Sequence, residues 1–172
     1  MKTFVIGSLL FLGLTTLSFS QNGTNIKEEK LDDVVVTPLN LTYTKFVQDE
    51  NTPEKARLLE NQAARFDVTE LEIFDNSFEA YEVIFRKNEG SIIATYDKNG
   101  KIIQSTERFE NVVLPASVRN KILTEYPGWA IQKDVYLVSY FEGRESTKTF
   151  KVQIKNGSKR KNLKIDSQGN MK

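Results

Sequence analysis

Residues 81–102, YEVIFRKNEGSIIATYDKNGKI, decide the fold, because residues 150–171, FKVQIKNGSKRKNLKIDSQGNM, repeat their pattern 69 positions further on (81 to 150). Tyr81, Val83 and Phe85 return as apolar residues in the second copy, and the Asp and Gly of the turn recur in place. A period of two is typical of a strand with one buried face. The sequence therefore predicts a duplicated β-hairpin.

The first 20 residues predict a signal peptide. Lys2 supplies the positive start, residues 4–14 form the apolar segment, and small residues at positions 18 and 20 fit cleavage after Ser20. A membrane anchor is the alternative, but this apolar run is shorter than the roughly 20 residues of a spanning helix. We expect a periplasmic or secreted protein that does not span the membrane after cleavage.

The remaining chain is expected to have three parts. Residues 21–47 form a flexible or extended N-terminal segment. Residues 48–112 and 113–172 each form one helix-plus-sheet repeat. Short turns between neighbouring strands require antiparallel pairing, so the predicted fold class is α+β, a tandem repeat of helix plus antiparallel β-meander with the helices packed on one face of the sheet. Whether the repeats share one continuous sheet or form two is left open.

Helices are predicted at residues 53–66 and 115–126, because each begins at a proline and carries apolar side chains at helical spacing. The face of the first helix that holds Glu60 is expected to be solvated. The extended segments are predicted at residues 78–87, 91–96, 101–109, 129–141, 149–155 and 159–165, with a bulge at 132–134 and weaker strands at 41–47 and 68–74.

The composition argues against the common catalytic residue sets. The chain has no His and no Cys, which excludes Ser/His/Asp and Cys/His nucleophile systems and the usual zinc sites. We predict a non-enzymatic protein with no cofactor and no metal. A small carboxylate-dependent enzyme using Glu70, Glu72 and Asp75 is the alternative, because neighbouring carboxylates can act as acid and base.

Several turn and cap motifs resemble a known family. They are YDKNGK at 96–101, Leu114-Pro115, Tyr126-Pro127 and DSQG at 166–169. Over residues 53–171 they resemble the PepSY-like group, described as similar to β-lactamase inhibitor protein. The resemblance implies an exported tandem repeat of helix and antiparallel strands, without a catalytic residue. That inhibitor binds its target across a concave, aromatic-rich sheet face, but it has disulfides and this chain has no Cys, so the resemblance concerns the fold alone.

Aromatic binding residues are predicted on residues 135–141, which are apolar on both faces. One face is expected to pack under the helices, and the other to present Tyr136 and Tyr140 on the helix-free side, with Trp129 close by in sequence. Exposed aromatic residues are typical binding anchors. The alternative is that residues 31–47 or the second repeat cover these tyrosines.

Basic binding residues are predicted in the hairpin 155–164, namely Arg160, Lys161 and Lys164. Residues 21–80 hold 13 acids and 6 bases, whereas residues 81–172 hold 10 acids and 17 bases. The expected partner is another envelope or secreted protein, with an anionic lipid or glycan as alternatives. Nucleic acid is not expected, because no aromatic residue interleaves the basic run. Edge-strand lysines that discourage aggregation are a structural alternative.

Together these features predict an exported, non-enzymatic binding module of unknown partner that uses an open β-sheet face. A second hypothesis is an envelope accessory protein tethered through residues 31–38, LDDVVVTP. That octad resembles the acidic and valine-rich segment that opens many TonB-dependent outer-membrane receptors. A simple tether or edge strand explains the same octad without that resemblance.

Overall fold

The computed structural model describes residues 40–75 and 77–172. The expected signal peptide and the octad 31–38 lie outside the described residues. The helices are α1 (Leu41–Val47), α2 (Glu54–Arg65) and α3 (Ala116–Glu125), with a short 3-10 helix, η1 (Val68–Glu70). The strands are β1 (Ala80–Lys87), β2 (Gly90–Asp97), β3 (Ile102–Glu110), β4 (Ala130–Phe141), β5 (Thr147–Asn156) and β6 (Lys159–Asp166).

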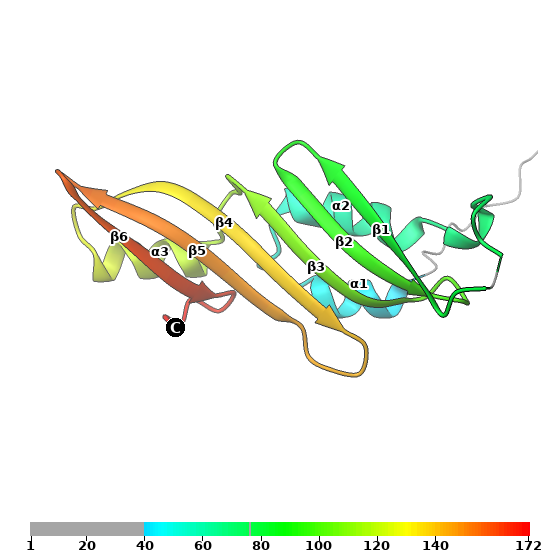
Figure 1. The fold of residues 1–172 in the computed structure, drawn as a ribbon. Helices are drawn as coiled ribbons and strands as arrows, with labels where there is room; N and C mark the ends of the chain where they lie inside the picture. The colour runs from blue at the N-terminus through cyan, green and yellow to red at the C-terminus, as the bar shows by residue number, and fades with distance from the viewer. Residues whose placement is uncertain (1–39, 76) are drawn as a thin grey trace, which may run out of the picture. The chain divides into compact units, whose positions relative to one another are not determined.

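All six strands form one antiparallel sheet in the order β1-β2-β3-β4-β5-β6 (Figure 1). Helix α2 precedes β1 to β3, α3 precedes β4 to β6, and pairing between β3 and β4 joins the two halves. The predicted α+β class, with antiparallel meanders and helices, is confirmed. The two repeats share a single continuous sheet.

The duplicated hairpins fold alike down to their register. Tyr81 pairs with Tyr96 between β1 and β2, and 69 residues later Phe150 pairs with Ile165 between β5 and β6. In the turn that follows each hairpin, an Asp carboxylate accepts hydrogen bonds from the N–H groups two and four residues on, all at 2.9 Å. Both turns contain a glycine with positive φ, a conformation that glycine adopts without steric cost.

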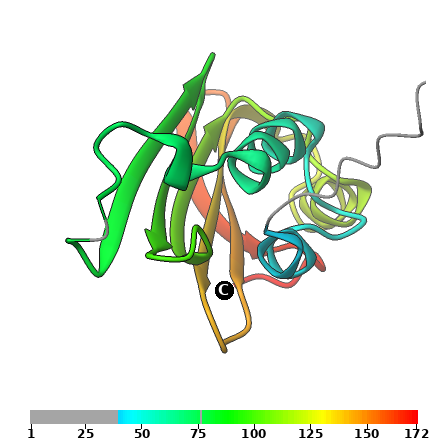
Figure 2. The same cartoon turned by 90° about the vertical axis from the view of Figure 1, so that its right-hand side faces the viewer.

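The three helices cover one face of the sheet and leave the opposite face, called here the open face, without a helix (Figure 2). Helix α2 buries Ala56, Leu59 and Ala63, while α3 buries Val118 and Ile122. Burial alternates along the strands, as a sheet covered on one side requires. The core therefore lies between the sheet and the helices.

Two short segments differ from the expected extended chain. Residues 41–47 form α1, because Tyr43 and Val47 are buried one helical turn apart and Asn40 ties the helix start to the β2–β3 connection. The Asn40 amide donates to a backbone carbonyl there at 3.1 Å and accepts from a backbone N–H at 2.6 Å. Residues 68–74 begin with η1, whose entry is capped by the Asp67 carboxylate. Tertiary contacts thus override strand propensity.

The expected bulge at residues 132–134 is confirmed by a register shift between Ile131 and Lys133 in the pairing of β4 with β5. Asp134 lies at this irregularity, and its carboxylate accepts a hydrogen bond from the Val112 N–H at 2.7 Å. The bulge therefore helps to hold the connection that leads into α3.

The expectation that Tyr136 and Tyr140 lie on the helix-free side is wrong. Both have 0% exposed surface, and Tyr136 stacks between Phe109 of β3 and Phe150 of β5, with ring centroids 6.2 and 4.5 Å away. Because β4 is apolar on both faces, its own pattern does not set which face is covered. The buried aromatics of its two neighbouring strands set it.

We expect Tyr136→Ala to lower the free energy of unfolding by about 3–5 kcal/mol, the usual cost of removing a buried aromatic ring. Tyr136→Phe should leave stability unchanged or raise it, because the Tyr136 hydroxyl is buried without a hydrogen-bond partner among the described residues. Urea unfolding followed by circular dichroism measures both variants. Equal losses for Ala and Phe would contradict this account of the stack.

Candidate functional site

The open face of β5 and β6 carries a ladder of polar cross-strand pairs. Since residues 150, 152 and 154 of β5 are buried under the helices, the odd-numbered residues between them lie on the open face. The directly opposite pairs there are Lys151 with Lys164, Gln153 with Asn162, and Lys155 with Arg160. Two of these three pairs oppose like charges, an arrangement that destabilises a sheet.

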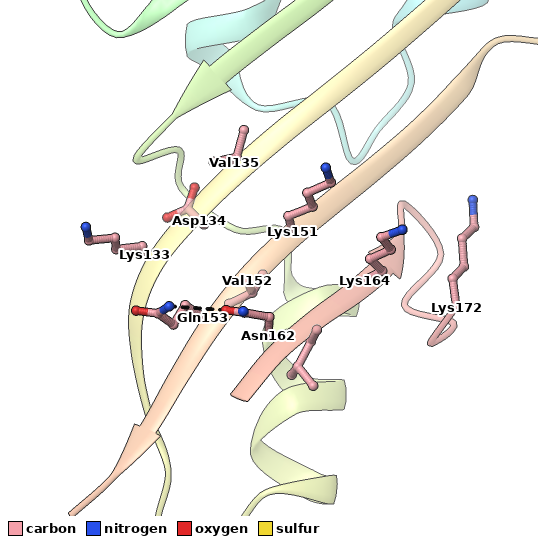
Figure 3. A pocket seen from close by; sticks show the side chains of 10 residues that line it. Lys133, Asp134, Val135, Lys151, Val152, Gln153, Asn162, Lys164 and Lys172 are labelled. Carbon is pink, nitrogen blue, oxygen red and sulfur yellow. Dashed lines mark hydrogen bonds between the residues drawn. The ribbon is translucent and has the colours of Figure 1, made fainter. Parts of the chain in front are cut away.

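Two adjoining hollows of about 490 and 520 Å³ lie over this part of the sheet, and Lys151, Lys164 and Lys172 line both of them. Figure 3 shows these three lysines side by side, on β5, on β6 and on the segment that follows β6. The Lys172 N–H donates to the Lys164 carbonyl at 2.8 Å, which holds that segment against β6. Lys133 of β4 lines the first hollow.

The two hollows also have an apolar component from β4. Val135 lines the first and Leu137 the second, and both are half-buried. Val135 lies directly opposite Lys151 in the pairing of β4 with β5. The candidate site, which we call the basic groove, therefore consists of Lys133, Lys151, Lys164, Lys172, Val135 and Leu137.

The lysines of the basic groove have no anionic partner in the described part of the chain, where all five salt bridges involve other residues. Asp166, at the end of β6, is occupied by its own turn. Burial alone would raise its pKa, but hydrogen bonds from Asn170 and Gln168 and the charge of Lys172 lower it. Asp166 therefore offsets part of the charge of Lys172, and the groove keeps a net positive charge beside apolar surface.

The structure divides the predicted binding residues between two places. Lys164 lies in the basic groove, and Arg160 lies further along β6 on the same open face. Lys161 instead lies over the Tyr126 ring, 4.6 Å from its centroid, and Trp129 packs edge-on against the same ring at 6.0 Å. Trp129 is half-buried against the core, so Trp129 and Lys161 stabilise the end of α3.

Sequence reasoning missed Lys133, Lys151 and Lys172 as members of this site. The signal for Lys151 was present, because it alternates with buried Phe150 and Val152, and the hairpin register sets it opposite Lys164. Lys172 carries no periodic signal, since an isolated bridge between Ile165 and Met171 brings it back beside β6. Lys133 sits in the bulge, where alternation is interrupted.

A pair of carboxyl groups is buried under α1. Glu60, expected on a solvated face, has 0% exposed surface, and Glu107 has 1%. Glu107 accepts hydrogen bonds from the Tyr43 hydroxyl at 2.7 Å and from the Ser105 hydroxyl at 2.8 Å. Burial and the charge of Glu107 raise the pKa of Glu60 to about 10, so Glu60 is neutral at pH 7.

Sequence reasoning missed this buried pair. Both side chains are closed to solvent, so a substrate has no surface at which to reach them. Its sequence signal was weak: Glu60 follows buried Leu59, and Glu107 alternates with Ser105 and Phe109 in β3. Its role is structural, because the Tyr43 bond to Glu107 joins α1 to β3.

The carboxylates proposed for catalysis lie apart from both groups. Glu70, Glu72 and Asp75 are all exposed, and Asp75 accepts hydrogen bonds from the Ser77 N–H at 2.9 Å and from its hydroxyl at 2.6 Å. These bonds from Ser77 lower the pKa of Asp75, which suits a turn cap. Within the described ranges, no cluster of three metal-ligating side chains occurs, and no helix has the length and apolar character to cross a membrane.

We expect Lys151→Glu to raise the free energy of unfolding by about 0.2–1 kcal/mol, because the new carboxylate would lie opposite Lys164 and replace a repulsive pair with an attractive one. Lys151→Gln should give a smaller gain, since it only removes the repulsion. Urea unfolding at low salt measures both, and the gain of the Glu variant should shrink in 0.5 M NaCl. A loss of stability in the Glu variant at low salt would contradict the assigned pairing.

We expect the stability of the protein to fall as pH rises from about 5 to 9. The folded chain keeps a proton on Glu60 up to a pKa of about 10, whereas the unfolded chain releases it near the ordinary Glu pKa of roughly 4.3, so stability is lost across this interval. Glu60→Gln keeps the shape without the titrating proton and should flatten the dependence of melting temperature on pH. Parallel curves for both proteins would contradict a buried neutral Glu60.

The comparisons with known proteins give one structural similarity. A BLIP-like protein from Bacteroides fragilis is 16% identical to this chain, with a TM-score of 0.30, and the match covers 55% of this chain and 73% of that one. No family model matches the chain, and no curated protein matches it either.

Proposed function

We propose that this chain is a non-enzymatic binding module that holds an acidic segment of a partner protein in the basic groove. The observation that carries the proposal is the directly opposite pair Lys151 and Lys164, joined by Lys172, with no salt bridge to any of them in the described part of the chain. Such an arrangement costs stability in the free protein, and carboxylates from a partner would remove that cost.

The shape of the groove suits an extended segment. It runs across the open face between β4 and the segment after β6, so one bound chain would meet Lys133, Lys151, Lys164 and Lys172 in turn. Val135 and Leu137 add apolar surface in the same hollows. Because alternate side chains of an extended peptide point to opposite sides, we expect acidic residues at every second position of the partner segment, so that all of them face the lysines. An apolar side chain at the β4 end of the same row would contact Val135 and Leu137.

Binding rather than catalysis fits the acidic residues as well. Glu70, Glu72 and Asp75 are exposed and Asp75 caps its own turn, while Glu60 and Glu107 are closed to solvent. We also propose that the protein is exported, because the sequence of residues 1–20 has the pattern of a signal peptide. A partner in the envelope or outside the cell would then be the one encountered.

The test uses a fluorescein-labelled synthetic peptide of alternating Glu and Val, with a Gln and Val peptide as its neutral counterpart. We expect the acidic peptide to bind more tightly, with an affinity that falls as salt is raised. Lys151→Glu combined with Lys164→Glu should weaken binding at least about tenfold, equivalent to 1.4 kcal/mol. Fluorescence polarisation measures the dissociation constants.

Lys98→Glu combined with Arg119→Glu is the matched control. It changes the net charge equally at two exposed positions, in the β2–β3 turn and on α3, and should leave binding nearly unchanged. If the control variant lost as much affinity for the acidic peptide, the effect would come from the overall charge of the protein, and the basic groove would not be the binding site. Binding to anionic lipid vesicles without binding to the acidic peptide would overturn the choice of a protein partner.

A further inference from the structure

Strand β1 is the outermost strand of the sheet (Figure 1). One row of its backbone groups therefore points away from β2. The Glu89 carbonyl accepts from a β3 residue and the Asp97 N–H donates toward β3, both at 2.8 Å. Odd-numbered positions along β2 thus bond to β3, and the even-numbered ones bond to β1. By the register of β1 with β2, the N–H and C=O groups of Glu82, Ile84 and Arg86 point outward.

No hydrogen bond to the backbone of these three residues is found outside the β1–β2 pairing within residues 40–75 and 77–172. All three side chains are exposed, and Ile84 keeps 49% of its surface accessible. Phe74 and Phe78 pack on Tyr81 at the beginning of the strand, so the free part of the edge is the five-residue stretch 82–86.

The internal duplication marks this edge as incomplete. Hairpin β1–β2 corresponds to hairpin β5–β6, in which β5 is flanked on its outer side by β4. Within the part of the chain that the structure describes, strand β1 has no such neighbour. An unpaired strand edge is a ready template for another strand, and here the second copy of the hairpin shows the position filled.

We propose that β1 pairs antiparallel with β1 of a second copy of this chain, about a twofold axis at Ile84. In this register Glu82 of each copy lies opposite Arg86 of the other, on the open face, so the contact contains two opposite-charge pairs. The two Ile84 side chains meet on the axis, beside Ile93, which is paired with Ile84 and is 38% exposed. Outward-pointing backbone groups then face each other along the whole stretch.

The charges select this register over its neighbours. Centring the contact on Glu82 would oppose two carboxylates, and centring it on Arg86 would oppose two guanidinium groups. Centring it on Val83 or Phe85 would leave neither Glu82 nor Arg86 opposite an opposite charge. Only the Ile84 register satisfies both residues, and a twofold symmetric contact of this kind is self-complementary.

The two-copy arrangement extends the sheet, with six strands from each copy. Because antiparallel pairing keeps like faces together, both open faces would lie on one side, and the pair would carry two basic grooves. Such a pair could bind a partner with two acidic segments more tightly than one copy could. The dimer does not depend on the identity of the groove's ligand.

Analytical ultracentrifugation of the purified protein tests the dimer. We expect a concentration-dependent dimer that Glu82→Arg weakens at least tenfold, as does Arg86→Glu. The double variant Glu82→Arg with Arg86→Glu should restore the dimer, because the reversed pairs are again complementary. The neighbours of these residues on β2 are Thr95 and Ser91, so the exchange disturbs no charge within the chain's own pairing.

Cysteine cross-linking supplies an independent readout, since the chain has no Cys of its own. Across the axis, two residues in a hydrogen-bonded antiparallel pair have Cα atoms about 5.5 Å apart, within the range of a disulfide. Ile84→Cys should therefore oxidise to a covalent dimer. Ile93→Cys, also exposed, should remain a monomer on non-reducing gels. Position 93 of one copy lies three strand spacings, each about 4.8 Å, from position 93 of the other.

A protein that stays monomeric at high micromolar concentration would overturn the proposal. So would a dimer that the charge reversals leave unaffected, or equal cross-linking of the two cysteine variants. Each of these outcomes leaves the basic groove and its test untouched.

Discussion

The stack of Phe109, Tyr136 and Phe150 is the interaction on which the rest of the sheet depends. It joins β3 of the first repeat to β4 and β5 of the second, and so turns two meanders into one sheet. It also fixes which face of β4 is covered, because a shift of one residue would exchange the two faces. Val135 and Leu137 reach the open face as a consequence, beside the lysines of β5.

Most of the fold is predictable because its signals are local. Helices that begin at a proline, strands with alternating apolar residues and turns that contain Asp and Gly can each be recognised in a short stretch of sequence. The duplication shows the hairpin pattern twice. Helix α1 is different. Its residues have ordinary strand preferences, and what makes them helical is burial of Tyr43 and Val47 together with the anchor at Asn40, whose bonding partners lie about 60 residues away.

The candidate site was predictable only in part. The basic character of hairpin β5–β6 is visible in the sequence, and Lys164 follows from it. Tyr136 and Tyr140 were misplaced because a strand that is apolar on both faces gives no sign of its own orientation, and the neighbours that decide it are remote in sequence. Lys172 joins the groove through a single bridge after β6, a contact that no periodic sequence pattern predicts.

Two groups of like charges remain in this fold, and physical chemistry treats them differently. Glu60 and Glu107 are out of contact with water, so the cost of two buried anions is avoided by keeping a proton on Glu60. The lysines of the basic groove lie at the surface, where water and salt screen their repulsion and no proton has to be lost. Repulsion in the first group is removed within the molecule, whereas repulsion in the second persists until an anion arrives. The open face, and not the buried pair, is therefore where this protein retains free energy that a partner can use.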